Sequence, residues 1–439
     1  MLVNTLHSII SSRLQLMYGL GQSYDGKRNL YEDLGYTLNP TFENYYGRYK
    51  RQDIASAIIN AYPNACWVNP PEISEDEEEE TEFETVWKDL VKEKRIFNYL
   101  LRADKISGIG NYSILLFGLD DGATFSSPVT KAKELMYLQT YMQNSAEIES
   151  YESDEKNIRF GLPKEYNIKL TTADKSGTVN KRVHFSRCLH IAENLLDNDI
   201  EGLPRLENIL NRLEDLEKIV GGSGEMFWRG AFPGFAFKKQ PDAIFDPEQG
   251  TAALEDEIDS YIHGLQRYMK LEGIDIESLT PQVVTPTAHV DAILDLIAGT
   301  TGIPKRILIG SERGELASSQ DETSWNKKIE GRQKNHCEPN ILRPFIDRLI
   351  EFGVLPEPKQ GYTVKWKSLY MLTDAEKATT AATKTSAIVA YANSSAAETV
   401  MPLQIFLKKI MELTDEEIEN ITSQLAGLIK EEEFIQMEE

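Results

Sequence analysis

The spacing of apolar residues divides the chain into a mixed first part and a mainly helical second part, with the change near residue 200. In the first part, Gln52–Tyr62 and Thr85–Lys105 have apolar residues at helical spacing, and Pro63 and Gly108 are expected to end these helices. Short apolar segments bounded by turn residues predict strands at Tyr112–Phe117, Leu135–Tyr141, Ile158–Phe160, Tyr166–Leu170 and Asn180–Ile191. The pattern therefore predicts an α+β fold for about the first 200 residues.

A long helix with a heptad-like apolar stripe is predicted next, with Pro204 in its first turn. Its packing residues are Leu206, Leu210, Leu213 and Leu216, and the glycines of Gly221–Gly224 are expected to interrupt it. Such a stripe is typical of a half-exposed helix that packs on neighbours.

A small αβ unit is predicted over residues 232–286, from the strand-like Phe232–Phe237, a helical Ala252–Leu271 and a closing strand at Leu279–Val284. A second helix follows at Thr287–Ala298, with Val290, Leu294 and Ile297 on its buried side. A long helix is then predicted over Asp321–Phe352, followed by a strand at Tyr362–Trp366. From Asp374 onward the chain is expected to be helical.

The segment between the last two of these long helices is rich in small and polar residues. It consists of Gly310, Ser311, Glu312, Arg313, Gly314, Glu315, Leu316, Ala317, Ser318 and Ser319. Glycine loosens the backbone and serine keeps a surface slim and polar. The segment suits either a surface past which something slides or a flexible connection between helices.

The composition is that of an ordinary globular protein, with 41% hydrophobic and 27% charged residues in a chain of 439, enough for two or three domains. No apolar run is long enough for a membrane span, and the start lacks the features of a signal peptide. The three cysteines, Cys66, Cys188 and Cys337, are predicted to be buried thiols.

The formal net charge of −23 disfavours a protein that grips DNA through many phosphate contacts, because such binding needs lysine and arginine. The same charge is compatible with plain solubility, or with the passage of DNA without tight binding. The helix from Asp321 is locally basic, and its first cationic residues are Lys327, Lys328, Arg332 and Lys334. Two interpretations stay open for this basic face: proximity to DNA phosphates, or ion pairing with an acidic neighbour.

Three motifs that resemble reactive sites do not meet the chemical requirements of such sites. Gly299–Lys305 lacks the Gly-Lys-Ser/Thr ending of a phosphate-binding loop. His184, Cys188 and His190 lack the spacing of a metal motif and are expected to have structural roles. The carboxylates of Glu312, Glu315, Asp321 and Glu322 fall on a Gly- and Ser-rich loop, whereas a two-metal nuclease needs rigidly held ligands. We therefore expect no catalytic residue, no metal and no cofactor.

The order of parts, together with two local phrases, resembles the portal proteins of tailed bacteriophages. The first phrase is Gly47-Arg48-Tyr49 followed by Asp53-Ile54-Ala55-Ser56, and the second runs from Gly302-Ile-Pro304 to Gly310-Ser311 and ends in Leu316-Ala317-Ser318. Among portal proteins, the sequence is most similar to the branch associated with Mu-like prophages.

The resemblance implies a portal fold with seven parts. These are a wing at 1–200, a first stem helix at 201–231, a clip at 232–286, a second stem helix at 287–302, a tunnel loop region at 303–320, a tunnel helix with a return to the wing at 321–373, and a helical crown at 374–439. Residues 310–319 would then line the narrowest part of a channel, and the apolar stripe of the stem would be buried against neighbouring subunits.

The same resemblance implies a dodecameric ring at one vertex of a virion, assembled in the cytoplasm of a bacterial host. Double-stranded DNA would pass through the ring without sequence specificity, for packaging and ejection. Its partners would be the large terminase subunit, head-completion or adaptor proteins, scaffold and major capsid protein, with no membrane. The alternatives are a head–tail adaptor or minor capsid protein, for which the chain is long, and a metal-dependent nuclease.

Overall fold

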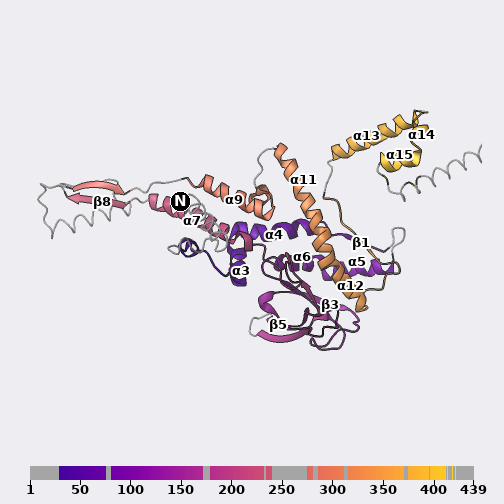
Figure 1. The fold of residues 1–439 in the computed structure, drawn as a ribbon, viewed down its shortest axis with the longest axis horizontal. Helices are drawn as coiled ribbons and strands as arrows, with labels where there is room; N and C mark the ends of the chain where they lie inside the picture. The colour runs from indigo at the N-terminus through magenta and orange to yellow at the C-terminus, as the bar shows by residue number, and fades with distance from the viewer. Residues whose placement is uncertain are drawn as a thin grey trace, which may run out of the picture. The chain divides into compact units, whose positions relative to one another are not determined.

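The computed structural model describes residues 29–75, 81–171, 178–231, 234–239, 274–279, 285–310, 315–369 and 374–411 except 395, together with residues 413, 418 and 421. The chain divides into two compact units, Met1–Lys367 and Ser368–Glu439, which we treat separately (Figure 1). Among the described residues, no helix combines the length and the apolar character needed to cross a lipid bilayer.

The first unit begins with three helices, α2 (Leu30–Leu34), α3 (Phe42–Arg51) and α4 (Asp53–Trp67). The expected end of α4 at Pro63 is wrong, because the helix continues to Trp67 with Pro63 inside it. Proline has no backbone N–H, so the carbonyl of Ile59 loses its normal helical partner. Arg205 Nη1 donates to that carbonyl at 2.9 Å and so supplies the missing hydrogen bond.

The single helix expected at Thr85–Lys105 is instead two helices, α5 (Glu82–Lys94) and α6 (Ile96–Ser107). Arg95 between them has φ 52°, in the left-handed region, which ends α5 and redirects the chain. The break lets both helices bury apolar residues, with Trp87 on α5 and Leu100 on α6 both in the core.

Two three-stranded antiparallel sheets form the β part of this unit. One has the order β3-β2-β7, from β3 (Leu135–Met142), β2 (Ser113–Leu119) and β7 (Cys188–Ile191). The other has the order β4-β5-β6, from β4 (Ala146–Tyr151), β5 (Pro163–Thr171) and β6 (Thr178–His184). Every residue of β2 is buried, as expected for a strand covered on both faces.

The two sheets share one apolar core, and helices cover the remaining face of β2. Ile114 of β2 and Ile168 of β5 belong to the same buried cluster. Phe117, which points to the opposite face of β2 from Ile114, stacks on Phe345 with ring centroids 5.3 Å apart. Helix α6 packs on β2 and β3.

Two of the predicted strands differ from the structure. Asn180–Ile191 is not one strand, because the short 3-10 turn η2 (Phe185–Arg187) separates β6 from β7, and these belong to different sheets. Ile158–Phe160 is a turn, and Ile158 is 99% exposed. The apolar residues of that segment are exposed and do not pack in a core, so the segment forms no strand.

Two further pairs of strands are short. The chain returns after residue 355 to pair β10 (Thr363–Lys365) with β1 (Glu72–Ser74). Strands β8 (Gly234–Lys239) and β9 (Ile274–Leu279) pair antiparallel, with Gly234 opposite Leu279. The helix expected at Ala252–Leu271 lies outside the described residues.

Helices α7 (Leu210–Ala231) and α9 (Thr287–Thr301) pack against each other, and the 3-10 turn η3 (Glu207–Ile209) leads into α7. The expected interruption at Gly221–Gly224 is wrong, since α7 runs through it. Gly299 likewise lies inside α9, and Gly302, with φ 69°, ends it.

The apolar stripe of these helices is buried within the chain itself, which corrects the expectation that neighbouring subunits would cover it. The stripe residues that are buried in the isolated chain are Leu206, Leu210, Leu213, Leu216, Leu294 and Ile297, while Val290 is partly buried. Polar bonds on the outer side of α7 reinforce this packing, since Tyr36 donates to Asp215 at 2.6 Å and Gln52 Nε2 to the carbonyl of Leu213 at 2.8 Å.

One continuous helical path runs from residue 315 to residue 351, as the long predicted helix requires. It comprises α11 (Glu315–Arg332), the π-helical segment η4 (Gln333–Leu342) and α12 (Arg343–Glu351), and the short helix α10 (Lys305–Ile309) precedes it. Pro339 lies inside η4, where it cannot donate a helical hydrogen bond. Segments of π-helix are frequent at functional or strained positions.

The second unit is helical where it is described, with α13 (Asp374–Ala392), α14 (Ala397–Val400) and α15 (Leu403–Lys409). Its small core gathers Phe406, Leu407, Met411 and Ile418, and Tyr391 stacks on Phe406. The helix expected at Asp415–Ile429 lies almost entirely outside the described residues.

Shortening Leu213 to alanine should lower the free energy of unfolding by about 2–5 kcal/mol, because its side chain is fully buried and its removal leaves a cavity. Urea unfolding of the purified chain measures the change. Val220→Ala on the same helix is the control, since Val220 is 52% exposed and should change the value by about 0.5 kcal/mol or less. Equal losses at both positions would contradict the burial described here.

Candidate functional site

A buried cluster of four charged side chains lies where α11 passes into η4. Asp104 comes from α6, Glu193 from the segment after β7, Arg205 from the segment before α7, and Arg332 from the last residue of α11. Their side chains are at most 14% exposed, and that of Asp104 is 0% exposed. Two negative and two positive charges therefore neutralise one another inside the protein.

Each guanidinium group bridges both carboxylates. Arg332 Nη2 donates to Asp104 Oδ1 at 2.5 Å, and Arg332 Nε donates to Glu193 Oε1 at 2.9 Å. Arg205 Nη2 donates to Asp104 Oδ1 at 3.0 Å, and Arg205 Nε donates to Glu193 Oε2 at 2.7 Å. Charge-assisted bonds with this geometry are the strong kind, and they fix direction as well as distance.

Further bonds tie the cluster to the surrounding helices. Trp67 Nε1 donates to Asp104 Oδ2 at 2.8 Å, which attaches the end of α4. Gln333, the residue after Arg332, donates from its Nε2 to the carbonyl of Cys66 at 2.9 Å. Together with the bond from Arg205 to Ile59, these contacts lock α4, α6 and the start of η4 into one arrangement.

The charges change the titration of the cluster. Burial alone would raise the pKa of Asp104, but the adjacent Arg332 and Arg205 outweigh burial and lower it. The same two arginines lower the pKa of Glu193 against the effect of burial. Burial acts to lower the pKa of Arg332, but Asp104 and Glu193 overcome it and raise the value well above its ordinary range. Asp104, Glu193 and Arg332 therefore stay charged at neutral pH.

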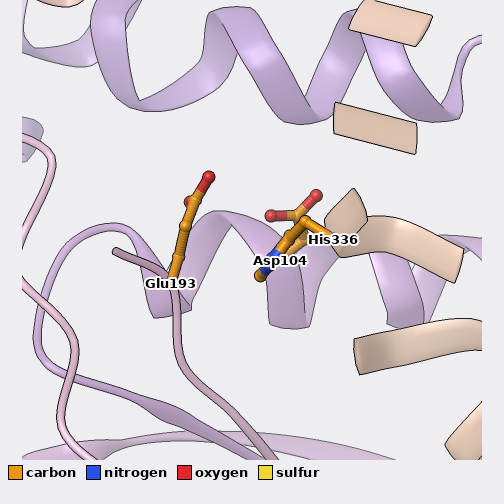
Figure 2. A group of neighbouring side chains, drawn as sticks. All are labelled: Asp104, Glu193 and His336. Carbon is orange, nitrogen blue, oxygen red and sulfur yellow. The ribbon is translucent and has the colours of Figure 1, made fainter. Parts of the chain in front are cut away.

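Asp104, Glu193 and His336 also lie close enough to suggest a metal site, with ligand atoms all within 4.8 Å of one another. Figure 2 shows the three side chains reaching this point from three different segments. The set does not suit a divalent cation, because the carboxylate oxygens already accept hydrogen bonds from Arg332 and Arg205, and two guanidinium groups would repel the ion. Burial, and then Arg332, lower the pKa of His336.

Two thiols complete the site. Arg332 Nη1 lies 3.5 Å from Cys66 Sγ and 3.2 Å from Cys337 Sγ. The expectation that all three cysteines are buried thiols is confirmed. Cys188 lies elsewhere, in the sheet core, where burial raises its pKa to about 12, so it is not a reactive thiolate.

The structure separates the four residues of the expected basic face. Lys327 and Lys334 are exposed, and the exposed Lys328 donates to the carbonyl of Gly302 at 2.7 Å. Arg332 is buried in the cluster, so of the two interpretations left open for the basic face, ion pairing with acidic residues applies to this residue. It pairs with acidic residues of its own chain, because the helix turns this position toward α6.

The expected loop 310–319 is shorter in the structure. Gly310 ends α10 with φ 64°, and Ser311, Glu312, Arg313 and Gly314 lie outside the described residues. The backbone of Glu315, Leu316, Ala317, Ser318 and Ser319 forms the first turns of α11, so these five residues are helical rather than loop. Helix formation there is favoured by the run Glu-Leu-Ala, which are good helix formers.

The motifs that the sequence analysis rejected have structural partners. Lys305, the expected end of a phosphate loop, pairs with Asp295 at 2.8 Å and Asp291 at 3.2 Å, which holds α10 on α9. His190 Nε2 lies 2.7 Å from the carbonyl of Ile200 and Nδ1 lies 3.1 Å from the hydroxyl of Tyr166. Of the carboxylates considered for a nuclease, Glu322 is an exposed residue of α11.

Sequence reasoning missed Asp104, Glu193 and Arg205. The only signal was Asp104, an acidic residue four positions after Leu100 on the buried side of α6. A charge on an apolar face indicates a buried partner, but which residues supply it depends on segments about 90 and 230 positions further along the chain.

A family model described as "Phage portal protein" matches residues 44–390. The chain therefore belongs to the phage portal protein family, and its role is that of a portal or connector component. That family is structural rather than catalytic. No curated protein matches the chain.

Solved structures with a similar fold come from phage-like particles. The neck of an empty GTA particle computed with C6 symmetry is 14% identical, with a TM-score of 0.50, over 78% of this chain and 94% of that chain. The virion of a native gene transfer agent particle is 15% identical, with a TM-score of 0.50, over 83% of this chain and 94% of that chain.

An HK97 family phage portal protein from Corynebacterium diphtheriae is 8% identical, with a TM-score of 0.39, over 75% of this chain and 97% of that chain. Membership of the branch found in Mu-like prophages stays a prediction.

Replacing Arg332 by methionine should lower the free energy of unfolding by about 3–5 kcal/mol, because it leaves two buried carboxylates with one guanidinium group. Urea unfolding at pH 7 measures the loss. Lys327→Met is the matched control on the exposed side of the same helix and should change the value by about 0.5 kcal/mol or less. A mild effect at Arg332 would show that the carboxylates are not held as described.

The protein should lose stability as the pH falls from 6.5 to 4, before the carboxylates titrate. Burial lowers the pKa of His190 to about 4, so an unfolded chain takes up a proton at His190 that the folded chain refuses. The loss from this group is at most about 3 kcal/mol. Below pH 4.5, protonation of Glu193 and Asp104, whose pKa values are lowered in the folded state, removes further stability.

Urea unfolding measured between pH 7.5 and 3 tests both stages. His190→Gln keeps a donor and an acceptor but does not titrate. It should reduce the first stage, to which His184 and His336 also contribute because their pKa values are lowered, while leaving the second. An unchanged first stage in this variant would assign it to another group.

Proposed function

We propose that this chain forms a homo-oligomeric ring, a dodecamer, around a channel for double-stranded DNA at one vertex of a phage capsid. Membership of the portal family supports this proposal, as does a fold similar to that in the neck of a GTA particle computed with symmetry. DNA enters during packaging and leaves during ejection through the same channel. The ring performs no catalysis of its own and is part of the virion, assembled in the host cytoplasm.

Within this ring, the parts of the chain take the roles expected from the family. Residues 1–200 form most of the wing, α7 and α9 form the stem, residues 232–286 the clip, and residues 374–439 the crown. Because α7 buries its leucine stripe against its own chain, contacts between subunits in the stem use other, exposed residues. Val220, Trp228 and Leu296 are large apolar residues that are at least half exposed on these two helices.

The observation that most supports the proposal is that the buried cluster anchors the C-terminal end of α11. Its last residue, Arg332, is held by three hydrogen bonds to the carboxylates of the buried cluster, while its first turn begins at Glu315. A helix anchored at its end has a defined direction. Such anchoring suits a helix beside a channel, because moving DNA would displace a loosely attached element.

The net charge of the chain favours the passage of DNA over tight binding of DNA. With a net charge of −23, the chain repels DNA. It therefore forms few contacts with phosphates that would have to break as the duplex advances. In the tunnel we assign Lys327 and Lys334, both exposed, to transient contacts with phosphates. The small residues around Gly310 and Ser311 keep the constriction narrow and smooth.

The clip side of the ring docks the large terminase subunit during packaging, and head-completion or adaptor proteins afterwards. Scaffold and major capsid protein contact other surfaces of the wing and crown. These partners are proposed from the family to which the chain belongs.

Deleting Ser311–Gly314 should leave ring assembly intact but impair the packaging or retention of DNA, because it removes the proposed constriction without touching the buried cluster. Electron microscopy of the purified variant measures assembly, and DNA per particle after complementation measures packaging. Replacing Asp154–Asn157, an exposed turn far from the cluster in sequence, with a Gly-Ser linker is the control. Normal DNA content in the deletion variant would contradict the proposed role.

A further inference from the structure

A cavity in the first unit lies between the β part and the helical path of η4 and α12. Its volume is about 290 Å³. Arg159, from the turn region between β4 and β5, and Arg348, from α12, both line it. The rest of the wall is largely apolar and includes Leu162, Leu189 and Pro344.

Both arginines are partly buried, and each uses only part of its hydrogen-bonding capacity. Arg348 Nη1 donates to the carbonyl of Phe185 at 3.3 Å. Arg159 Nη2 donates to the carbonyl of Pro163 at 2.9 Å, and its guanidinium carbon lies 3.7 Å from the centre of the Phe185 ring. A guanidinium group carries five N–H donors, so several remain on each side chain.

Neither Arg159 nor Arg348 forms an ion pair with a carboxylate of the described residues. The three other arginines with largely buried side chains all do: Arg187 pairs with Asp121, and Arg205 and Arg332 pair with Asp104 and Glu193. The chain has 70 acidic against 47 basic residues, so carboxylates are in ample supply. Two unpaired positive charges on one cavity are costly unless something negative enters it.

The other polar groups on the wall do not supply that negative charge. His190 is neutral, since burial lowers its pKa, and both ring nitrogens have partners in Tyr166 and Ile200. Burial lowers the pKa of Arg348 and of Arg159. Glu351 acts on Arg348 and Glu152 on Arg159 in the opposite direction, but neither carboxylate forms an ion pair with them or lines the cavity. Asp199 lines the cavity but is exposed and forms no ion pair with either arginine.

We propose that this cavity binds an oxyanion group, a phosphate or a carboxylate, held between the guanidinium groups of Arg159 and Arg348. Planar guanidinium groups match the oxygens of both anions with paired hydrogen bonds. The apolar wall fits a short aliphatic or peptide part attached to the anion. The group can come from a free anion or from an acidic side chain of a bound peptide, and the experiment separates these sources.

Isothermal titration calorimetry of the full-length chain at constant ionic strength tests the proposal with three probes. Inorganic phosphate represents the free anion, the blocked tripeptide acetyl-Leu-Glu-Leu-amide the peptide carboxylate, and acetyl-Leu-Gln-Leu-amide its neutral match. Arg159→Gln and Arg348→Gln remove one charge each but keep a donor for the backbone carbonyl. Arg182→Gln, at an exposed arginine of β6 that pairs with Glu149, is the control.

Binding of phosphate or of the glutamate peptide, but not of the glutamine peptide, is the expected result. Either cavity variant should weaken that binding about tenfold or more, whereas Arg182→Gln should leave it unchanged. Without the probe, the thermal midpoint of each cavity variant should be equal to or above that of the parent, because a cation facing the cavity has been removed. A purely structural arginine would lower it.

No heat from any charged probe would overturn the proposal, as would binding that survives both cavity variants. A cavity variant that loses binding and also melts well below the parent would assign the arginine to folding, and would equally overturn it. Preference for phosphate identifies a free anion as the source, and preference for the glutamate peptide identifies an acidic segment of a partner.

Discussion

The pairing of Arg332 and Arg205 with Asp104 and Glu193 is the constraint on which the rest of the first unit depends. Four charges removed from water are tolerated only as a complete set, because losing any one leaves its partners buried without compensation. The set joins α6, the end of β7, the approach to α7 and the end of α11. The direction of α11 is therefore fixed by electrostatics as well as by packing.

Two helical segments next to the cluster, α4 and η4, each stay continuous through an internal proline. Arg205 replaces the hydrogen bond that Pro63 cannot make in α4, and the π-helical segment that begins after Arg332 accommodates Pro339. Both irregular places border the site. Side-chain hydrogen bonds from segments distant in sequence offset this backbone irregularity. Such irregular backbone is common where the surrounding structure fixes the geometry of a site.

Arginine has two different roles in this strongly acidic chain. Where it is paired with carboxylates, as at Arg187, it holds segments together. Where it is unpaired on a cavity, as at Arg159 and Arg348, it is suited to a ligand that arrives from outside. Lysine on α11 remains at the surface, exposed to solvent. A large negative net charge thus coexists with local positive sites of distinct function.

The sequence by itself determined most of the helices and strands, because hydrophobic periodicity and turn residues act locally, and its resemblance to portal proteins indicated the family. The buried strand β2, the helices α7 and α9, and the long helical path were predictable from spacing. Only the tertiary structure decided that Arg332 faces inward, that α4 passes through Pro63, and that β6 and β7 separate into two sheets. Each of these depends on a partner that is distant in sequence, and no local pattern encodes such a partner.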